Sequence, residues 1–194
     1  MNCTREDATE DVLKARDDLL TDCERSKRYH SARLRFYETT NRWFIFAMVA
    51  SSAGAIVQWG NASVPWLPAV TAALGLFSLV FDLSGKARLH DSLYRRCANL
   101  NGRIESSADS KQSDISEWRI AIHGIYGDEP PVYRVLNQHC ANQVLQSLYE
   151  DIEENAAIYR KYYVPLSWYH RWFKNLLPFS NFRVTPFAKE DKAF

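Results

Sequence analysis

The sequence contains little glycine, proline, cysteine or methionine: 7 Gly, 7 Pro, 4 Cys and 2 Met among 194 residues. So few glycines and prolines exclude a collagen-like or low-complexity chain, and aromatic residues at 13 % supply apolar surface for a folded core. Neither sign of charge dominates, because 24 Lys+Arg stand against 23 Asp+Glu. This balance argues against a nucleic-acid-binding tail or an acidic solvating segment as the main feature of the chain, and we expect no nucleic-acid partner.

The chain also lacks the short motifs of the common enzyme classes. No GxxxxGK[ST], GxGxxG, GxSxG or HExxH pattern occurs in it. The spacing of the four cysteines, Cys3, Cys23, Cys97 and Cys140, fits neither a CxxC pair nor a zinc site. We therefore expect a protein that is not an enzyme, that holds no metal or cofactor, and whose thiols stay reduced in the cytoplasm.

The most informative absence is that of charge between Trp43 and Phe81, where no Asp, Glu, Lys, Arg or His occurs. A run of roughly 40 such residues is too long for one crossing of a lipid hydrocarbon core and fits two crossings. Turn-forming residues interrupt it at 60–63. We predict membrane spans over 43–59 and 64–83; the alternative is a soluble protein that buries the same helical hairpin.

Aromatic and basic residues at the ends of the two runs predict their orientation. Trp43, Trp59 and Trp66 lie where indole rings favour the headgroup level of a bilayer. The outer turn has no Lys or Arg, whereas both flanks are basic and include Arg35, Arg42, Lys86 and Arg88. Because cationic flanks resist translocation, we expect a multi-pass protein with both termini in the cytoplasm and the lipid bilayer as a partner.

The segments on either side of the hairpin carry helical patterns. We expect residues 1–42 to form an amphipathic basic helix that leads into the membrane. Residues 84–104 are expected to form a helix that packs on it, through one face made of Leu89, Leu93, Cys97, Leu100 and Ile104. The predicted fold class is therefore all-α: an integral membrane protein with a two-helix transmembrane hairpin and a cytosolic helical bundle.

Residues 105–160 are predicted to form an acidic helical cytosolic region. A capping box at Asp114 predicts the start of a short helix that runs through Ile122, and its end is predicted by Gly124, Gly127, Pro130 and Pro131. Apolar residues at near four-residue spacing predict one long helix from Val132 to Tyr159.

The tail, residues 161–194, is aromatic and basic. Its stretch from Leu166 to Leu177 includes Trp168 and Trp172 and suits a helix lying in a membrane interface. The same rings could instead cover the acidic cytosolic helices, and the pattern does not separate the two interpretations.

Small and polar residues form a stripe along each predicted span. The stripes comprise Ser51, Gly54, Ala55 and Gln58 in the first span and Thr71, Gly75, Ser78 and Asp82 in the second. The opposite faces, with residues such as Phe46, Val49 and Phe77, are expected to contact lipid. The stripes could pack the two helices together, or line a pore between several hairpins with Asp82 at its cytoplasmic mouth. Asp82 could also pair with Lys86.

Two sequence blocks flank the hairpin: ERSKRYHSARLRFYETTNRW before it and KARLHDSLYRRCANLNGRI after it. With the charge-free hairpin between them, they resemble the SLATT family, two-transmembrane effectors of bacterial nucleotide-linked defence systems. The resemblance covers roughly Glu24 to Ile104. It implies a bacterial inner-membrane effector that oligomerises with its own copies and forms a pore in antiphage defence. It further implies a nucleotide second messenger or an upstream sensor protein as the activating partner.

The sequence thus leads to two functional hypotheses. In the first, the protein is an effector that oligomerises and permeabilises the inner membrane on activation. In the second, the hairpin only anchors a helical adaptor or signalling module that forms no pore.

Overall fold

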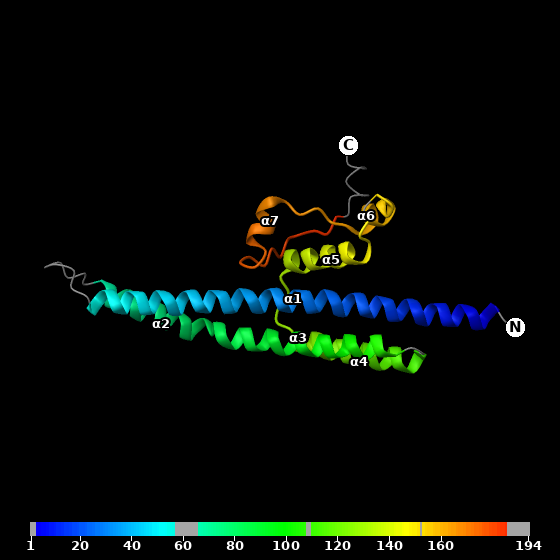
Figure 1. The fold of residues 1–194 in the computed structure, drawn as a ribbon, viewed down its shortest axis with the longest axis horizontal. Helices are drawn as coiled ribbons and strands as arrows, with labels where there is room; N and C mark the ends of the chain where they lie inside the picture. The colour runs from blue at the N-terminus through cyan, green and yellow to red at the C-terminus, as the bar shows by residue number, and fades with distance from the viewer. Residues whose placement is uncertain (1–2, 57–65, 108–109, 152, 186–194) are drawn as a thin grey trace. The chain divides into compact units, whose positions relative to one another are not determined.

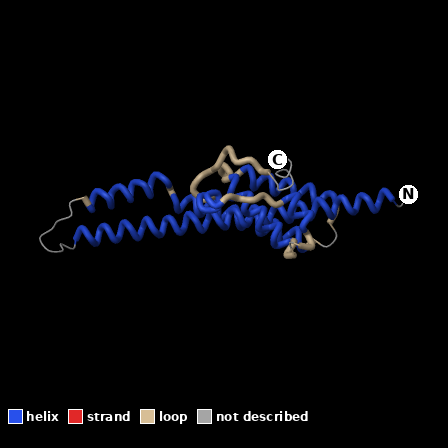
Figure 2. Tube along the Cα trace, turned by 90° about the horizontal axis from the view of Figure 1, so that it is seen from above, coloured by secondary structure: helices blue, strands red, loops and turns tan. Residues whose placement is uncertain are grey.

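The structure is a computed structural model that describes residues 3–56, 66–107, 110–151 and 153–185. Over these residues all regular secondary structure is helical, with no strand (Figure 2). The helices, labelled in Figure 1, are α1 (Cys3–Ile56), α2 (Leu67–Phe81), α3 (Leu83–Ser106), α4 (Gln112–Gly127), α5 (Arg134–Leu148), α6 (Ala156–Tyr162) and α7 (Trp168–Phe173). The all-α prediction is therefore confirmed for the described residues.

The chain divides into two compact units. The first comprises Met1–His30 together with Leu93–Phe194, and the second comprises Ser31–Ser92. Helices α1 and α3 contribute residues to both units.

The core of the first unit lies between α1, α3 and α4. On α3 it includes Leu93, Cys97, Leu100 and Ile104, which are four of the five residues expected on one apolar face. They pack with Leu19 and Cys23 of α1 and with Ile115, Trp118, Ile122 and Ile125 of α4. The fifth expected residue, Leu89, belongs to the second unit and is exposed. Three amphipathic helices thus bury their apolar stripes against one another.

Helix α4 has different ends from those predicted. It begins at Gln112, and Asp114 is its third residue, where a carboxylate oxygen accepts a hydrogen bond from the Lys111 amide at 2.9 Å. The helix also continues through Gly124 to Gly127. Burial of Ile125 in the core offsets the cost of about 1 kcal/mol that a glycine imposes on a helix interior.

The single helix predicted from Val132 to Tyr159 is wrong, because the structure has α5 and α6 instead. Between them, the Asp151 carboxylate accepts hydrogen bonds from the amides of Glu153 and Glu154, at 2.9 and 3.1 Å. This local capping competes with a continuous helix, and the acidic residues crowded here would repel one another on a helical surface.

The second unit pairs the later part of α1 with α2, which run side by side in both views (Figures 1 and 2). No residue of α2 is buried. One helical stretch of the described residues, Leu67–Ser106, is long and apolar enough to cross a membrane. The other predicted span, 43–59, runs past the end of α1 into residues outside the described part of the chain.

Helices α2 and α3 meet at Asp82, whose backbone adopts the left-handed conformation with φ of 39°. Aspartate tolerates this conformation better than most residues. Its carboxylate then accepts a hydrogen bond from the Gly85 amide at 3.0 Å and so caps the start of α3. The Asp82 carboxylate is thus used to cap α3, and not for the ion pair with Lys86 that the sequence suggested as an alternative. The Lys86 ammonium lies 5.7 Å from the Phe81 ring centroid.

Candidate functional site

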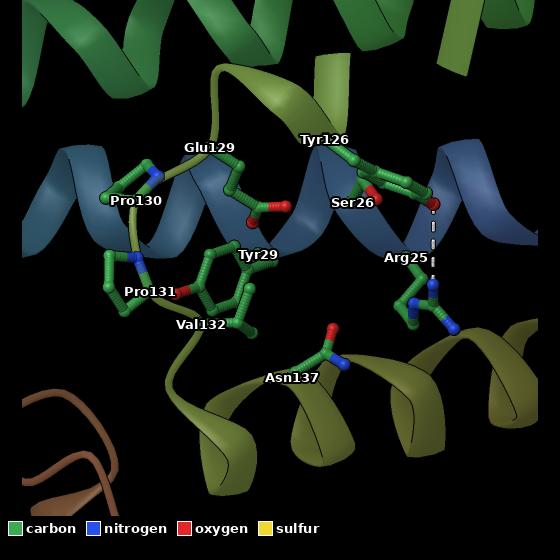
Figure 3. Close-up of a pocket in the computed structure, with 9 residues that line it drawn as sticks. All are labelled: Arg25, Ser26, Tyr29, Tyr126, Glu129, Pro130, Pro131, Val132 and Asn137. Atoms are coloured by element: carbon green, nitrogen blue, oxygen red, sulfur yellow. Dashed lines mark hydrogen bonds between the residues drawn. The ribbon is translucent and has the colours of Figure 1, made fainter. Parts of the chain in front are cut away.

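The first unit contains a pocket of about 370 Å³ between α1, the end of α4, the loop that follows α4, and α5. Its volume lies at the lower end of the range typical of small-molecule sites. Figure 3 shows polar side chains from several segments around its centre, with Pro130, Pro131 and Val132 along one wall. The two prolines fix an extended backbone, which carries the chain from α4 across to α5.

Each side of the pocket contributes a different polar group. Helix α1 supplies the Arg25 guanidinium and the Ser26 hydroxyl, α5 supplies the Asn137 amide, and the loop after α4 supplies the Glu129 carboxyl (Figure 3). Tyr29, which is fully buried, accepts a hydrogen bond on its hydroxyl oxygen from the Tyr133 amide at 3.1 Å. This bond fastens the wall of the pocket to α1.

Arg25 is held at one end of the pocket. One of its terminal nitrogens forms an ion pair with Asp22 at 3.0 Å and lies 3.5 Å from the Tyr126 hydroxyl (Figure 3). Its Nε atom is buried and has no hydrogen-bond partner in the protein. A buried donor without a partner costs free energy, so a ligand oxygen that reached this atom would bind favourably.

Glu129 is the chemically unusual group of the pocket. Only 10 % of its side chain is exposed, and its Oε1 lies 3.7 Å from Nε2 of the buried His30. Burial raises the pKa of this carboxyl to about 7, against the opposing effect of the Arg25 guanidinium. Near neutral pH the group is therefore poised to donate a proton in a hydrogen bond or to accept one from a ligand.

The arrangement fits the recognition of a small polar molecule. A guanidinium at one end suits an anionic or carbonyl oxygen, and a carboxyl at the other suits an N–H donor. Among the described residues, no group of three or more His, Cys, Asp or Glu side chains is placed to hold a metal ion.

Sequence reasoning did not find this pocket. Its residues come from α1, from the segment 126–132 and from α5, so no local spacing relates them. The one local signal is Glu129 followed by two prolines, which places a charged residue at a fixed backbone position.

The polar stripes of the hairpin face each other in the second unit. The hydroxyls of Ser51 and Thr71 form a hydrogen bond at 2.7 Å, with Thr71 also donating to the Leu67 carbonyl. Gly75 lies on the same side of α2, and a Cβ atom added to it would be in ordinary contact, at 3.9 Å, with the sulfur of Met48 on α1. Ser78 follows on the same side of α2 and is half-buried. The structure therefore brings Ser51, Thr71 and Gly75 together as a helix-packing surface.

The last predicted residues of the first span have no described side chains or lie outside the described residues. Gly54 and Ala55 are in α1, but their side chains are not described, and Gln58 and Trp59 lie outside the described residues. Phe77, expected to face lipid, is 38 % exposed, and its ring also stacks on Phe44 of α1 with ring centroids 4.8 Å apart. An aromatic pair therefore joins the two helices beside the polar contact.

The predicted flanking residues are exposed where the structure describes them. Trp43 and Trp66 expose most of their side chains, and the basic residues Arg35, Arg42, Lys86 and Arg88 are all exposed. Arg42 contacts Glu38 at 3.8 Å.

One basic residue before the hairpin behaves differently. Arg33 is 2 % exposed, its guanidinium lies 4.5 Å from the Tyr37 ring centroid, and it donates a hydrogen bond to the Tyr37 hydroxyl. Tyr37 in turn stacks on His90 of α3. Burial, together with Arg33, lowers the pKa of His90 to about 4, so the imidazole is neutral at pH 7. The sequence pattern gave no sign of this polar cluster.

No protein-family model, curated protein or solved structure matches this chain. The resemblance to the SLATT family therefore remains a prediction.

Proposed function

We propose that this chain is a two-span bacterial inner-membrane effector with both termini in the cytoplasm, which oligomerises and permeabilises the membrane when its cytosolic pocket is occupied. The supporting observation is the distribution of side chains in the second unit. Large apolar side chains are exposed on its surface, and a polar contact lies between α1 and α2. Phe46 and Val49 of α1 and Leu76, Leu79 and Val80 of α2 are exposed, whereas the Ser51 and Thr71 hydroxyls are hydrogen-bonded to each other. This distribution suits helices surrounded by lipid.

In this proposal the described hairpin is a closed state. Its polar stripes are used for contact between α1 and α2, so a pore requires several hairpins to exchange that contact for one that faces a common lumen. Two helices alone cannot enclose a channel. A ligand shifts such an equilibrium in proportion to its differential affinity for the two assemblies.

The pocket provides a place where an activating ligand could act. Arg25, Ser26 and Tyr29 line it and belong to α1, the same continuous helix that carries Ser51. We propose a small polar ligand with an anionic or carbonyl oxygen, and a nucleotide second messenger meets this description. An upstream sensor protein remains the alternative activator.

Leakage from liposomes reconstituted with the full-length protein tests the proposal. We expect release of a trapped dye after addition of an activating cyclic nucleotide, and a loss of at least about fivefold for Ser78→Leu, whose bulk blocks the stripe. Val80→Leu, on an exposed position of the same helix, is the matched control and should leak like the wild type. Asp82→Asn keeps the cap of α3 but removes the charge, so it should lower cation selectivity without preventing leakage.

A second candidate function, a membrane-anchored adaptor without a pore, is favoured by the use of Asp82 as a helix cap and of Ser51 and Thr71 as packing groups. It predicts no leakage from correctly inserted protein under any of these conditions. It also predicts that changes in the pocket, such as Arg25→Ala, abolish signalling while Ser78→Leu has no effect.

A further inference from the structure

The chain after α5 is folded against α5 through a buried amide. The Asn142 side chain donates a hydrogen bond to the Val164 carbonyl at 2.7 Å and accepts one from the Val164 amide at 3.2 Å. Both residues are buried. A reciprocal pair of this kind fixes the backbone at Val164, so the residues that follow start from a defined position.

A second set of contacts closes the segment on itself. The His170 ring lies edge-on to Phe179 and Phe182, with centroid distances of 4.9 and 5.1 Å. Phe179 has a φ of 43°, an uncommon conformation for a large side chain, which surrounding contacts must hold in place. The segment from Val164 to Phe182 is therefore a structured part of the first unit.

This structured segment presents large apolar side chains to solvent. Trp168 and Trp172, which lie on the same face of α7, are 73 % and 79 % exposed. The other members of the exposed set are Tyr169, Phe173, Leu176 and Leu177, and we call the six residues the tail patch. Because they are so exposed, the two indoles do not cover the acidic cytosolic helices. Covering those helices is one of the two roles that the sequence suggests for the rings of the tail. So many large exposed apolar side chains within one short segment are typical of an interaction surface.

The charge around the tail patch indicates what it contacts. The segment 160–194 is basic: Arg160, Lys161, Arg171, Lys174, Arg183, Lys189 and Lys192 stand against Glu190 and Asp191. Arg160, Lys161, Arg171 and Arg183 are exposed. Indole rings favour the headgroup region of a bilayer, and exposed basic residues are attracted to anionic lipids.

We propose that the tail patch binds the surface of an anionic lipid bilayer, with Trp168 and Trp172 at headgroup level. This inference rests on one part of the proposed function, namely that the hairpin holds the chain at a membrane. It adds a second membrane contact, made by the cytosolic unit and independent of the hairpin.

A label in the tail patch tests this in the full-length protein. The variant Leu176→Cys, with Cys3→Ser to remove a competing thiol, carries an environment-sensitive fluorophore in proteoliposomes with nitroxide-bearing lipid headgroups. We expect quenching to increase at least about twofold when phosphatidylglycerol is added to phosphatidylcholine vesicles. Trp168→Ser with Trp172→Ser should abolish the increase and leave the helix content unchanged, because both indoles are exposed. A label at the exposed Ser116→Cys on α4 is the control and should not be quenched.

The outcomes separate this inference from the proposed function. Quenching that ignores the anionic lipid or survives the double tryptophan variant would overturn the inference. So would quenching that rises with protein density at a constant lipid ratio, which indicates contact between copies. Lipid contact of the tail patch without dye leakage would overturn the proposed pore and support the membrane contact of the tail patch. Dye leakage without lipid contact of the tail patch would support the pore and overturn this inference.

Discussion

Glu129 is nearly buried, lies 3.7 Å from the His30 imidazole and shares its pocket with the Arg25 guanidinium. Burial outweighs the Arg25 charge and raises the carboxyl pKa from its ordinary 4.5 to about 7. The folded state therefore binds this proton more tightly than the unfolded chain does. Its contribution to stability is fully present below about pH 4.5 and is lost as the pH rises through about 7.

Glu129→Gln should remove this dependence, because the amide resembles the protonated carboxyl and does not ionise. We expect the wild type to lose roughly 2 kcal/mol, or about 5 °C in Tm, between pH 5 and pH 8 relative to the variant. Thermal unfolding of the purified protein in detergent, followed by circular dichroism, gives both curves. Parallel curves for the two proteins would show that the carboxyl is already ionised at pH 5.

At the scale of elements, the junction between α2 and α3 depends on two residues. Asp82 caps α3 by accepting a hydrogen bond from the Gly85 amide. A Cβ atom on residue 85 would lie 1.9 Å from the nearest Asp82 carboxylate oxygen. An alanine at position 85 would therefore displace the Asp82 carboxylate from the position in which it caps α3.

Asp82→Ala and Gly85→Ala should thus remove the same interaction. Each should lower the stability of the fold by about 1 kcal/mol, even though alanine normally favours a helix over glycine. The double variant should cost no more than Asp82→Ala alone, because the cap can be lost only once. Guanidinium unfolding of the four proteins provides the cycle, in which additive losses would count against a shared cap. Asp82→Asn should remain close to the wild type.

The sequence predicted those elements whose residues act locally. The apolar spacing from Leu93 to Ile104 was enough to find the buried face of α3, because helical periodicity is a property of neighbouring residues. The break between α5 and α6 was missed, because the apolar pattern continues through it while the Asp151 carboxylate caps the chain. The left-handed residue at Asp82 was missed for the same reason.

The candidate pocket lay beyond sequence reasoning for a different reason. Arg25, Glu129 and Asn137 are brought together only by the packing of α1, α4 and α5. Arg33 illustrates the same limit. Its charge placed it with the basic flank, but the aromatic ring of Tyr37 and the stacked His90 bury it.

For the whole molecule, the distribution of charge predicts how the chain lies across a membrane. The uncharged segment 43–81 separates two charged regions, and the predicted outer turn has no basic residue. Both charged regions are therefore expected on the same, cytoplasmic side.

Single cysteines test this topology in intact cells, with Cys3→Ser as the background. We expect a membrane-impermeant maleimide to label Ala62→Cys, in the predicted outer turn, without permeabilisation. Ser116→Cys should be labelled only after the membrane is opened. Labelling of both positions in intact cells would exclude a cytoplasmic location for α4, and labelling of neither would exclude a translocated turn.

The buried thiols give the molecule an internal reporter of opening. Cys23, Cys97 and Cys140 are free and buried, and burial raises their pKa values to about 12, 11 and 11. An alkylating reagent reacts with the thiolate form of cysteine. In the folded chain these thiols are protected in two ways, because burial keeps the reagent away from them and because their raised pKa values keep them protonated. Cys23 and Cys97 lie in the shared core of α1, α3 and α4, whereas Cys140 lies on α5. The order in which these sites become modified during a brief pulse would therefore show which packing contact an activating ligand loosens first.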